Sequence, residues 1–210
     1  MSDFKIKTIV FDLGGVYFTD GSTLAKKKIR EIFNIKDINS ILTVFGSAPG
    51  TIGHKIRLGL ITMEEFEEEC GSILKIPKID IYHIRHLWFG SYVINYKMEE
   101  IVKELSKNYR LIVFSGNVRE RIEYLDEKYD FLKYFDDKVL SYDYQLNKSD
   151  TEFYKELLIH LDCRPNEAII IDDERKNLNK AEPFGFNLIH YYYTEKMIES
   201  LKNYNIYLNL

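Results

Sequence analysis

Carboxylate, hydroxyl and ammonium side chains follow four short apolar runs of the chain. These residues, each with the run that it follows, are Asp12 after Thr8–Phe11, Ser115 after Leu111–Phe114, Lys148 shortly after Val139–Leu140, and Asp172 with Asp173 after Ala168–Ile171. Continuous apolar runs of this length are typical of strands that are covered on both faces. Parallel strands end at one edge of their sheet, so we expect these side chains to share one crevice.

The chemistry that these residue types favour is phosphoryl transfer. Crowded carboxylates raise one another's pKa unless a cation lies among them. Mg²⁺ prefers hard oxygen ligands and commonly takes one or two carboxylates together with a phosphate oxygen. A lysine and a serine beside the ion are suited to hold a tetrahedral oxyanion. A carboxylate that attacks phosphorus forms an aspartyl-phosphate, which divides a difficult displacement into two easier ones.

Amphipathic helical segments alternate with the apolar runs. Met98–Leu105 places Met98, Ile101, Val102 and Leu105 on one face. Thr151–Leu161 likewise has an apolar face. Strands that alternate with helices predict an α/β fold, a Rossmann-like doubly wound parallel sheet.

The segment after the first run interrupts this alternation. We expect three helices in it, at Thr23–Phe33, Thr62–Leu74 and Asp80–Phe89. Thr62 and Glu65 have the spacing of a capping box at the start of the second helix. We therefore expect residues 1–20 and 97–210 to form the α/β core, and residues 21–96 to form a helical cap over the strand ends.

In these motifs the chain resembles the haloacid dehalogenase (HAD)-like hydrolase superfamily. The branch that it resembles contains sugar-phosphate phosphatases and the phosphatase domain of soluble epoxide hydrolases. Four motifs occur in the family's order: Phe-Asp-Leu-Gly-Gly-Val at 11–16, Ser-Gly-Asn at 115–117, Lys148, and Asp172-Asp173 with Asn177 four residues later. The resemblance covers nearly the whole chain and implies the HAD core fold with a cap inserted after the first strand.

The resemblance also implies a role for each motif residue. Asp12 is the expected nucleophile and a Mg²⁺ ligand, and Lys148 the expected catalytic cation. Further metal ligands would be the Gly14 carbonyl and Asp173, with Asp172 binding directly or through water. Ser115, Gly116 and Asn117 are the expected substrate-binding residues, and Asn177 is expected to orient an aspartate.

Gly14 departs from the pattern of the superfamily. Most of its phosphatases carry an aspartate two positions after the nucleophile, which acts as general acid and then as general base. Loss of such a group lowers the rate of the reaction by about 10²–10⁴-fold. The first motif with Gly14 nevertheless resembles one found in the sugar-phosphate branch. Asp20, eight residues after Asp12, is an unproven substitute.

Composition excludes several other classes of protein. The 210 residues carry a net charge of −4 with no long basic stripe, so we expect no nucleic-acid partner. Cys70 and Cys163 lie far apart and outside any CxxC spacing, which predicts buried free thiols in a cytoplasmic protein. No stretch has the length and hydropathy of a signal peptide or a membrane span. We expect a monomer or dimer.

Histidines and aromatic residues of the cap region have structural and functional interpretations. His83 and His86 lie three residues apart, either as solvated side chains or as a metal pair without a third ligand. Trp88, Phe89 and Tyr92 are either core of the cap or a wall against the substrate. His54 is a weak candidate for a substrate contact.

The function that the sequence predicts best is Mg²⁺-dependent hydrolysis of a small phosphorylated metabolite. A carbon–halogen hydrolase is one alternative, but that branch needs no metal and lacks the paired aspartates. The other is a binding or regulatory protein that has lost turnover because of Gly14. A phosphotransferase remains a further alternative.

Overall fold

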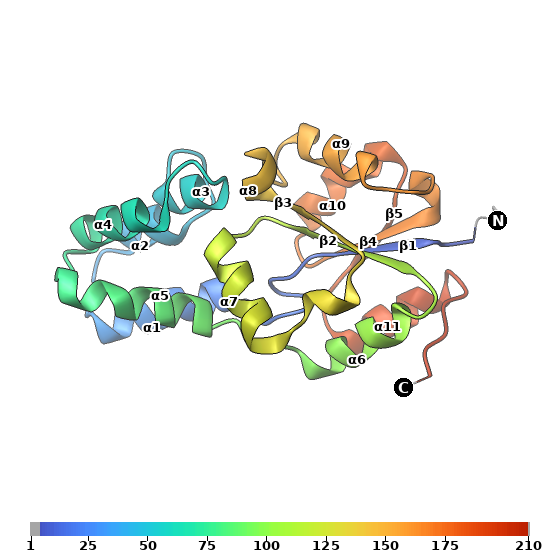
Figure 1. Ribbon diagram of the computed structural model, residues 1–210, viewed down its shortest axis with the longest axis horizontal. Coiled ribbons are helices and arrows are strands. Elements are labelled where there is room, and N and C mark those ends of the chain that lie inside the picture. Colours follow the sequence, from blue (N-terminus) through green and yellow to red (C-terminus); the bar gives the residue numbers. More distant parts are fainter. Residues whose placement is uncertain (1–4, 210) are drawn as a thin grey trace.

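Five parallel strands form the centre of the computed structural model, which describes residues 5–209 (Figure 1). In the order in which they lie side by side, they are β3 (Asp137–Leu140), β2 (Arg110–Ser115), β1 (Thr8–Phe11), β4 (Ala168–Asp172) and β5 (Asn187–His190). The four predicted strands and the doubly wound, Rossmann-like α/β fold are confirmed. The fifth strand was not predicted, because it has only two apolar residues between polar ones.

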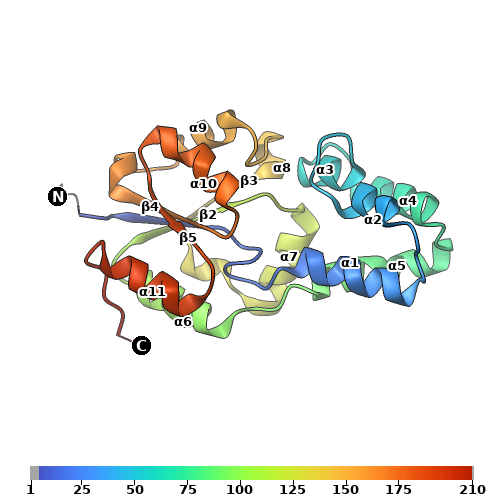
Figure 2. The same cartoon turned by 180° about the vertical axis from the view of Figure 1, so that it is seen from behind.

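The apolar runs are continuous because helices cover both faces of the sheet. Along β1, Ile9 and Phe11 belong to one buried cluster, whereas Val10 belongs to the other. The first face is covered by α6 (Tyr96–Leu105), α7 (Arg119–Tyr129) and α11 (Thr194–Lys202). The second is covered by α9 (Thr151–Ile159) and α10 (Arg175–Ala181), as Figures 1 and 2 show.

Five helices between β1 and α6 form a separate group, here termed the helical lobe. They are α1 (Gly21–Ile32), α2 (Ile38–Phe45), α3 (Ile52–Arg57), α4 (Met63–Leu74) and α5 (Ile81–Gly90). The lobe lies at the side where β1 and β2 end (Figure 1). The predicted helices correspond to α1, α4 and α5, and α2 and α3 were missed.

Short helices complete the described chain. These are α8 (Ser141–Tyr144) and four 3₁₀ turns at Lys78–Asp80, Leu132–Tyr134, Pro165–Glu167 and Glu182–Phe184. The predicted capping box is present, since Thr62 Oγ1 accepts from Glu65 N at 3.2 Å and Glu65 Oε2 accepts from Thr62 N at 2.8 Å. No helix among residues 5–209 is long and apolar enough to cross a membrane.

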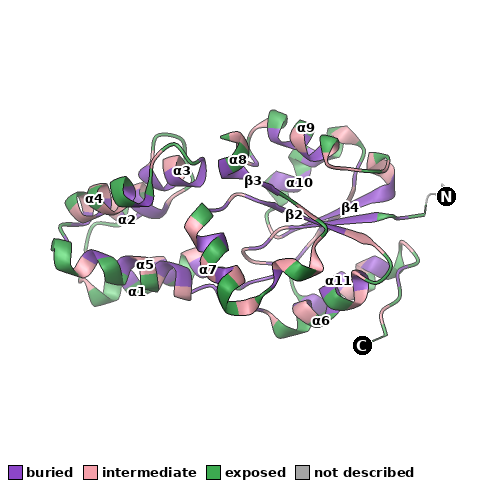
Figure 3. Ribbon diagram, viewed as in Figure 1, coloured by how far each residue is buried: buried purple, intermediate pink, exposed green. Residues whose placement is uncertain are grey.

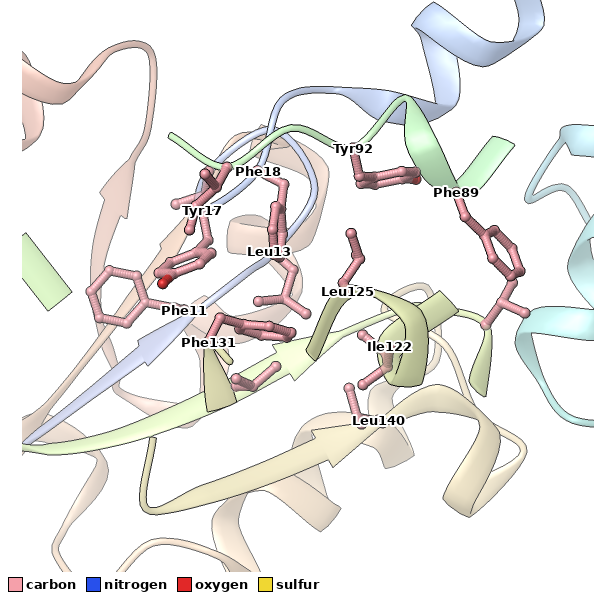
Figure 4. Packing of buried hydrophobic residues seen from close by; sticks show 14 of the residues in the cluster. Phe11, Leu13, Tyr17, Phe18, Phe89, Tyr92, Ile122, Leu125, Phe131 and Leu140 are labelled. Carbon is pink, nitrogen blue, oxygen red and sulfur yellow. The ribbon is translucent and has the colours of Figure 1, made fainter. Parts of the chain in front are cut away.

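Two chain segments join the lobe to the sheet and run side by side. Asn95 N donates to Tyr17 O at 3.0 Å, and Thr19 N donates to Val93 O at 2.9 Å. Beneath them Phe18 packs edge-on against Phe131, with ring centroids 5.1 Å apart (Figure 4). One buried cluster extends from the lobe to the sheet, and the buried strands and lobe interior are visible in Figure 3. The lobe is therefore packed onto the sheet.

Candidate active site

Three aspartates meet where β1 and β4 end. Each of Asp12, Asp172 and Asp173 offers an oxygen within 4.8 Å of those of the other two. The sheet register explains this, because Phe11 pairs with Ile171 and Asp12 N donates to Ile171 O at 3.0 Å. β1 and β4 are neighbours although they lie far apart in the sequence, so strand pairing brings the acids together.

Lys148 contacts two of the three acids. Its Nζ lies 3.0 Å from Asp12 Oδ1 and 2.6 Å from Asp172 Oδ2, and its side chain is buried. Burial alone lowers the pKa of Lys148, but the charges of Asp12 and Asp172 outweigh it and hold this pKa above its ordinary value. Lys148 is therefore a permanent cation between the two carboxylates.

The two oxygens of Asp12 differ in their surroundings. Oδ1 accepts from Leu13 N at 2.7 Å and from Ser115 Oγ at 3.0 Å, in addition to its ion pair with Lys148. Among residues 5–209, no group donates to Oδ2. Burial raises the pKa of Asp12 to about 6, although the charge of Lys148 opposes the shift. One oxygen is thus held in place while the other is available to react.

Asp173 is the acid without a cation partner. Its carboxylate has no hydrogen bond or ion pair with any residue of the described range. Burial, together with the charges of Asp12 and Asp172, raises the pKa of Asp173 to about 7. A divalent cation would relieve this repulsion, so the donor set fits Mg²⁺. The carbonyl of Gly14, two residues after Asp12, accepts no hydrogen bond from residues 5–209.

Asp172 is held by the start of α10. Asn177 Nδ2 donates to its two oxygens at 3.0 and 3.2 Å, and Glu174 N donates to Oδ1 at 2.8 Å. Asp172 is 1% exposed, so these contacts and Lys148 account for most of its surroundings. The expectation that Asn177 orients an aspartate agrees with this geometry.

The loop after β2 lies beside Asp12. Ser115 Oγ reaches Asp12, and Asn117 Nδ2 lies 3.5 Å from Ser115 Oγ. A side chain built at Gly116 would meet nothing within 4 Å, so the loop is open at this point. Asn117 Oδ1 accepts from Arg121 Nε at 2.6 Å. The structure therefore brings together the side chains of Asp12, Ser115, Asn117, Lys148, Asp172, Asp173 and Asn177.

Other candidates from the sequence lie elsewhere or have ordinary contacts. Asp20 is exposed and caps α1 by accepting from Thr23 N at 3.1 Å. His83 and His86 are exposed, and among residues 5–209 only the three aspartates form a candidate metal group, so the metal pair finds no support. His54 Nε2 lies 3.0 Å from Asn147 Nδ2.

The structure also decides how the aromatic residues and the thiols are buried. Trp88, Phe89 and Tyr92 are all buried. Both cysteines are free, but the prediction that both are buried is wrong for Cys163, which is half-buried because its Sγ lies at the rim of β1, 3.4 Å from Thr8 Oγ1.

Two arginines near the site were not predicted, whereas Tyr92 was expected either in the core of the cap or as a wall against the substrate. Arg121 and Arg57 are buried at the junction between the lobe and the sheet, and the Tyr92 ring lies 3.4 Å from the position of a Cβ at Gly14. The sequence offers only a weak signal for Arg121, its position one helical turn after Asn117. For Arg57 no motif marks the position.

Comparison with known proteins identifies the family. The model of the haloacid dehalogenase-like hydrolases matches residues 6–179. The chain belongs to this family. It is a hydrolase of the HAD type, as the resemblance of the four motifs predicted. An uncharacterized protein of Dictyostelium discoideum is 29% identical over 170 residues, which cover 79% of this chain and 71% of that protein.

Solved structures of HAD proteins share the fold. The HAD family enzyme BT-2542 of Bacteroides thetaiotaomicron has a TM-score of 0.78 at 22% identity, over 94% of this chain and 98% of that one. Its complex with magnesium and inorganic phosphate has a TM-score of 0.74 at 22% identity, over 89% and 94%. The L-2-haloacid dehalogenase of Xanthobacter autotrophicus has a TM-score of 0.65 at 13% identity, over 94% and 83%.

Proposed function

We propose that this hydrolase is a Mg²⁺-dependent phosphatase that cleaves the phosphomonoester of a small metabolite. The observation that carries the proposal is the unpartnered Oδ2 of Asp12 within a group of three aspartates and a buried lysine. The magnesium and phosphate bound to BT-2542 support it. Against a carbon–halogen hydrolase stands the pair Asp172 and Asp173, which would have no purpose in a reaction without a metal.

Asp12, Asp173 and the Gly14 carbonyl would hold the metal, with Asp172 binding directly or through water. When bound, Mg²⁺ offsets the negative charge of the carboxylates and of the phosphoryl oxygens. Lys148 supplies one positive charge between Asp12 and Asp172. This arrangement reduces the repulsion between an anionic nucleophile and an anionic substrate.

Asp12 Oδ2 would attack phosphorus, and the bond from phosphorus to the ester oxygen would break. The products of this step are an aspartyl-phosphate and an alkoxide, which takes a proton from water. A second water then hydrolyses the acyl-phosphate, which releases inorganic phosphate and restores the Asp12 carboxylate. Ser115 and Asn117, with the backbone amide of Gly116, would bind the transferring phosphoryl group.

Gly14 supports a second candidate function, binding or regulation without efficient turnover. Glycine has no side chain, and a Cβ at Gly14 would contact the Tyr92 ring at 3.4 Å. No carboxylic acid is therefore available there to protonate the leaving group. Ester oxygens that leave without protonation would be cleaved best, and a fully inactive protein would retain only the metal and phosphate site.

We infer further that residues 21–96 act as a cap on a core formed by residues 1–20 and 97–210. Contacts at the site support this role, because Ser141 Oγ donates to the Arg57 carbonyl of the lobe at 2.5 Å. A helical cap favours a small metabolite over nucleic acid or a phosphoprotein as substrate. Two free cysteines agree with a reducing, cytoplasmic location.

Hydrolysis of p-nitrophenyl phosphate with and without Mg²⁺ tests the proposal, because its leaving group needs little protonation. We expect Mg²⁺-dependent turnover that Asp12→Asn lowers by about 10³-fold or more. Asp37→Asn is the matched control, since Asp37 is exposed and an asparagine side chain at this position would cap α2 equally well. Turnover of the wild type no higher than that of Asp12→Asn would reject the phosphatase and favour the binding protein.

A further inference from the structure

Two buried cations at the junction of lobe and sheet have no acidic partner. Arg57 ends α3 in the lobe and is 9% exposed, and Arg121 lies in α7 beside the sheet and is 1% exposed. Among residues 5–209, no carboxylate lies within ion-pair distance of either guanidinium. A buried charge is normally paired, so two of them together require an explanation.

The two guanidiniums lie close to one aromatic group. The Arg57 and Arg121 guanidinium carbons lie 5.4 and 5.1 Å from the centre of the Trp88 ring. Arg121 also lies 4.4 Å from the centre of the Tyr92 ring. Burial, followed by the charge of Arg121, lowers the pKa of Arg57 to about 10. The two like charges are thus close enough to repel each other.

Two buried hydrogen-bond donors at this junction have no acceptor among the described residues. Arg121 Nη1 and Trp88 Nε1 are both buried and have no hydrogen-bond partner. Arg57 is engaged only by uncharged groups, the Gly53 carbonyl at 2.6 Å and the Phe45 carbonyl at 3.2 Å among them. Unpartnered donors beside two positive charges are what an anionic oxygen group would satisfy.

This junction is connected to the candidate nucleophile. Arg121 Nε donates to Asn117, which contacts Ser115, and Ser115 donates to Asp12. The charge of Asp12 also acts on Arg121, where it opposes the lowering of the pKa by burial. Two side chains, those of Asn117 and Ser115, therefore connect Arg121 to the proposed nucleophile.

We propose that Arg121, with Arg57 beside it, binds a second anionic group of the substrate, so that the substrate is a small phosphate ester that also carries a carboxylate or a second phosphate. This rests on the proposed phosphatase function. Since Arg57 belongs to the lobe and Arg121 to the sheet side, the anion also joins the two parts of the molecule around the substrate. The substrate is then selected by two groups, the phosphate ester that Asp12 attacks and the second anion that Arg121 and Arg57 bind.

Calorimetric titration with three phosphonates in the presence of Mg²⁺ tests the proposal. Ethylphosphonate has no second charge, 2-carboxyethylphosphonate adds a carboxylate and 1,2-ethylenediphosphonate adds a second phosphonate to the same two-carbon unit. We expect one of the charged ligands to bind the wild type about tenfold or more tightly than ethylphosphonate. Which of the two does so identifies the second group.

Substitutions of two arginines on α7 distinguish binding of the second anion from a general effect on the structure. Arg121→Gln should reduce the affinity for the preferred charged ligand much more than that for ethylphosphonate. Arg119→Gln is the matched control, because Arg119 is exposed on the same helix and pairs with Asp143, and it should retain the preference. Equal wild-type affinities for all three ligands, or an equal loss for all three in Arg121→Gln, would overturn the proposal.

The affinities of the wild type for the three phosphonates test the second anion site even if Arg121→Gln does not fold. Hydrolysis of p-nitrophenyl phosphate by the same sample separates the two proposals. Turnover without a preference for charged phosphonates rejects only the second anion site, whereas absence of turnover rejects the phosphatase.

Discussion

Burial of the charged carboxylates of Asp12 and Asp173 in the candidate site lowers the stability of the folded protein. Burial raises the pKa of Asp12 to about 6 and that of Asp173 to about 7. Lys148 compensates Asp12 by direct contact, but no ion pair compensates Asp173 within residues 5–209. Charge on Asp173 is therefore unfavourable in the folded protein until a cation binds.

Removing this charge should stabilise the metal-free protein. Between its ordinary value of 3.8 and about 7, Asp173 binds more protons in the folded than in the unfolded chain, so the free energy of unfolding decreases as the pH rises through this window. We expect Asp173→Asn to be more stable than the wild type by about 1–2 kcal/mol at neutral or higher pH, in urea unfolding with a chelator present. The difference should shrink toward pH 4.

With Mg²⁺ present, the wild type should be more stable than Asp173→Asn, because the ion stabilises the wild type and has little effect on the variant. Glu100→Gln, a change of an exposed acid on α6, is the control and should follow the wild type. A wild type that is as stable as Asp173→Asn above pH 7 without metal would contradict the electrostatic explanation.

The turn after β1 lies directly against Asp173. Gly15 has φ +85°, which side chains other than glycine adopt at a cost, and a Cβ there would lie 2.2 Å from Asp173 Oδ2. At the other side of the site, α10 holds Asp172 through Asn177. The two elements place the carboxylates by backbone geometry as much as by side-chain contacts.

Gly15→Ala should therefore damage both the backbone and the metal site. We expect a loss of about 1–3 kcal/mol in the free energy of unfolding, together with loss of the Mg²⁺-induced rise in melting temperature. Gly185→Ala is a matched control, because Gly185 has φ +83° but a Cβ there meets nothing within 4 Å. It should lose about 1–2 kcal/mol and retain the response to Mg²⁺. An unchanged response in Gly15→Ala would disprove the close approach.

At the scale of the whole molecule, lobe and sheet share one hydrophobic core. The cluster includes Val44 and Phe66 of the lobe together with Ile9 and Leu111 of the sheet. The two joining segments are hydrogen-bonded to each other through Thr19 and neighbouring backbone groups. A shared core predicts that the two parts unfold together.

Trp88 provides a probe of this cooperativity, since it is the single tryptophan and lies in the lobe. We expect its fluorescence and the far-ultraviolet circular dichroism to report the same urea midpoint. An earlier midpoint for Trp88 would show that the lobe unfolds separately. Mg²⁺ should shift both midpoints equally, because it binds the folded molecule as a unit.

Local patterns were sufficient for the strands and for the site motifs. Runs such as Thr8–Phe11 are apolar at nearly every position, as a strand covered on both faces requires, and polar residues directly after such strands must lie at one edge of the sheet. Helices α2 and α3 were missed because they have only eight and six residues, too short for a clear periodic pattern.

The sequence by itself determined the doubly wound sheet and the residues at the strand ends, because these depend on short-range patterns of polarity, and the family, because its four motifs are local. Only the tertiary structure decided which carboxylate lacks a cation, that the Tyr92 ring lies beside Gly14, and that Arg57 and Arg121 lie near the same Trp88 ring without an acid among the described residues. These facts depend on side chains from distant segments that approach across the junction of lobe and sheet. No spacing along the chain encodes that approach, since it results from how the two parts pack.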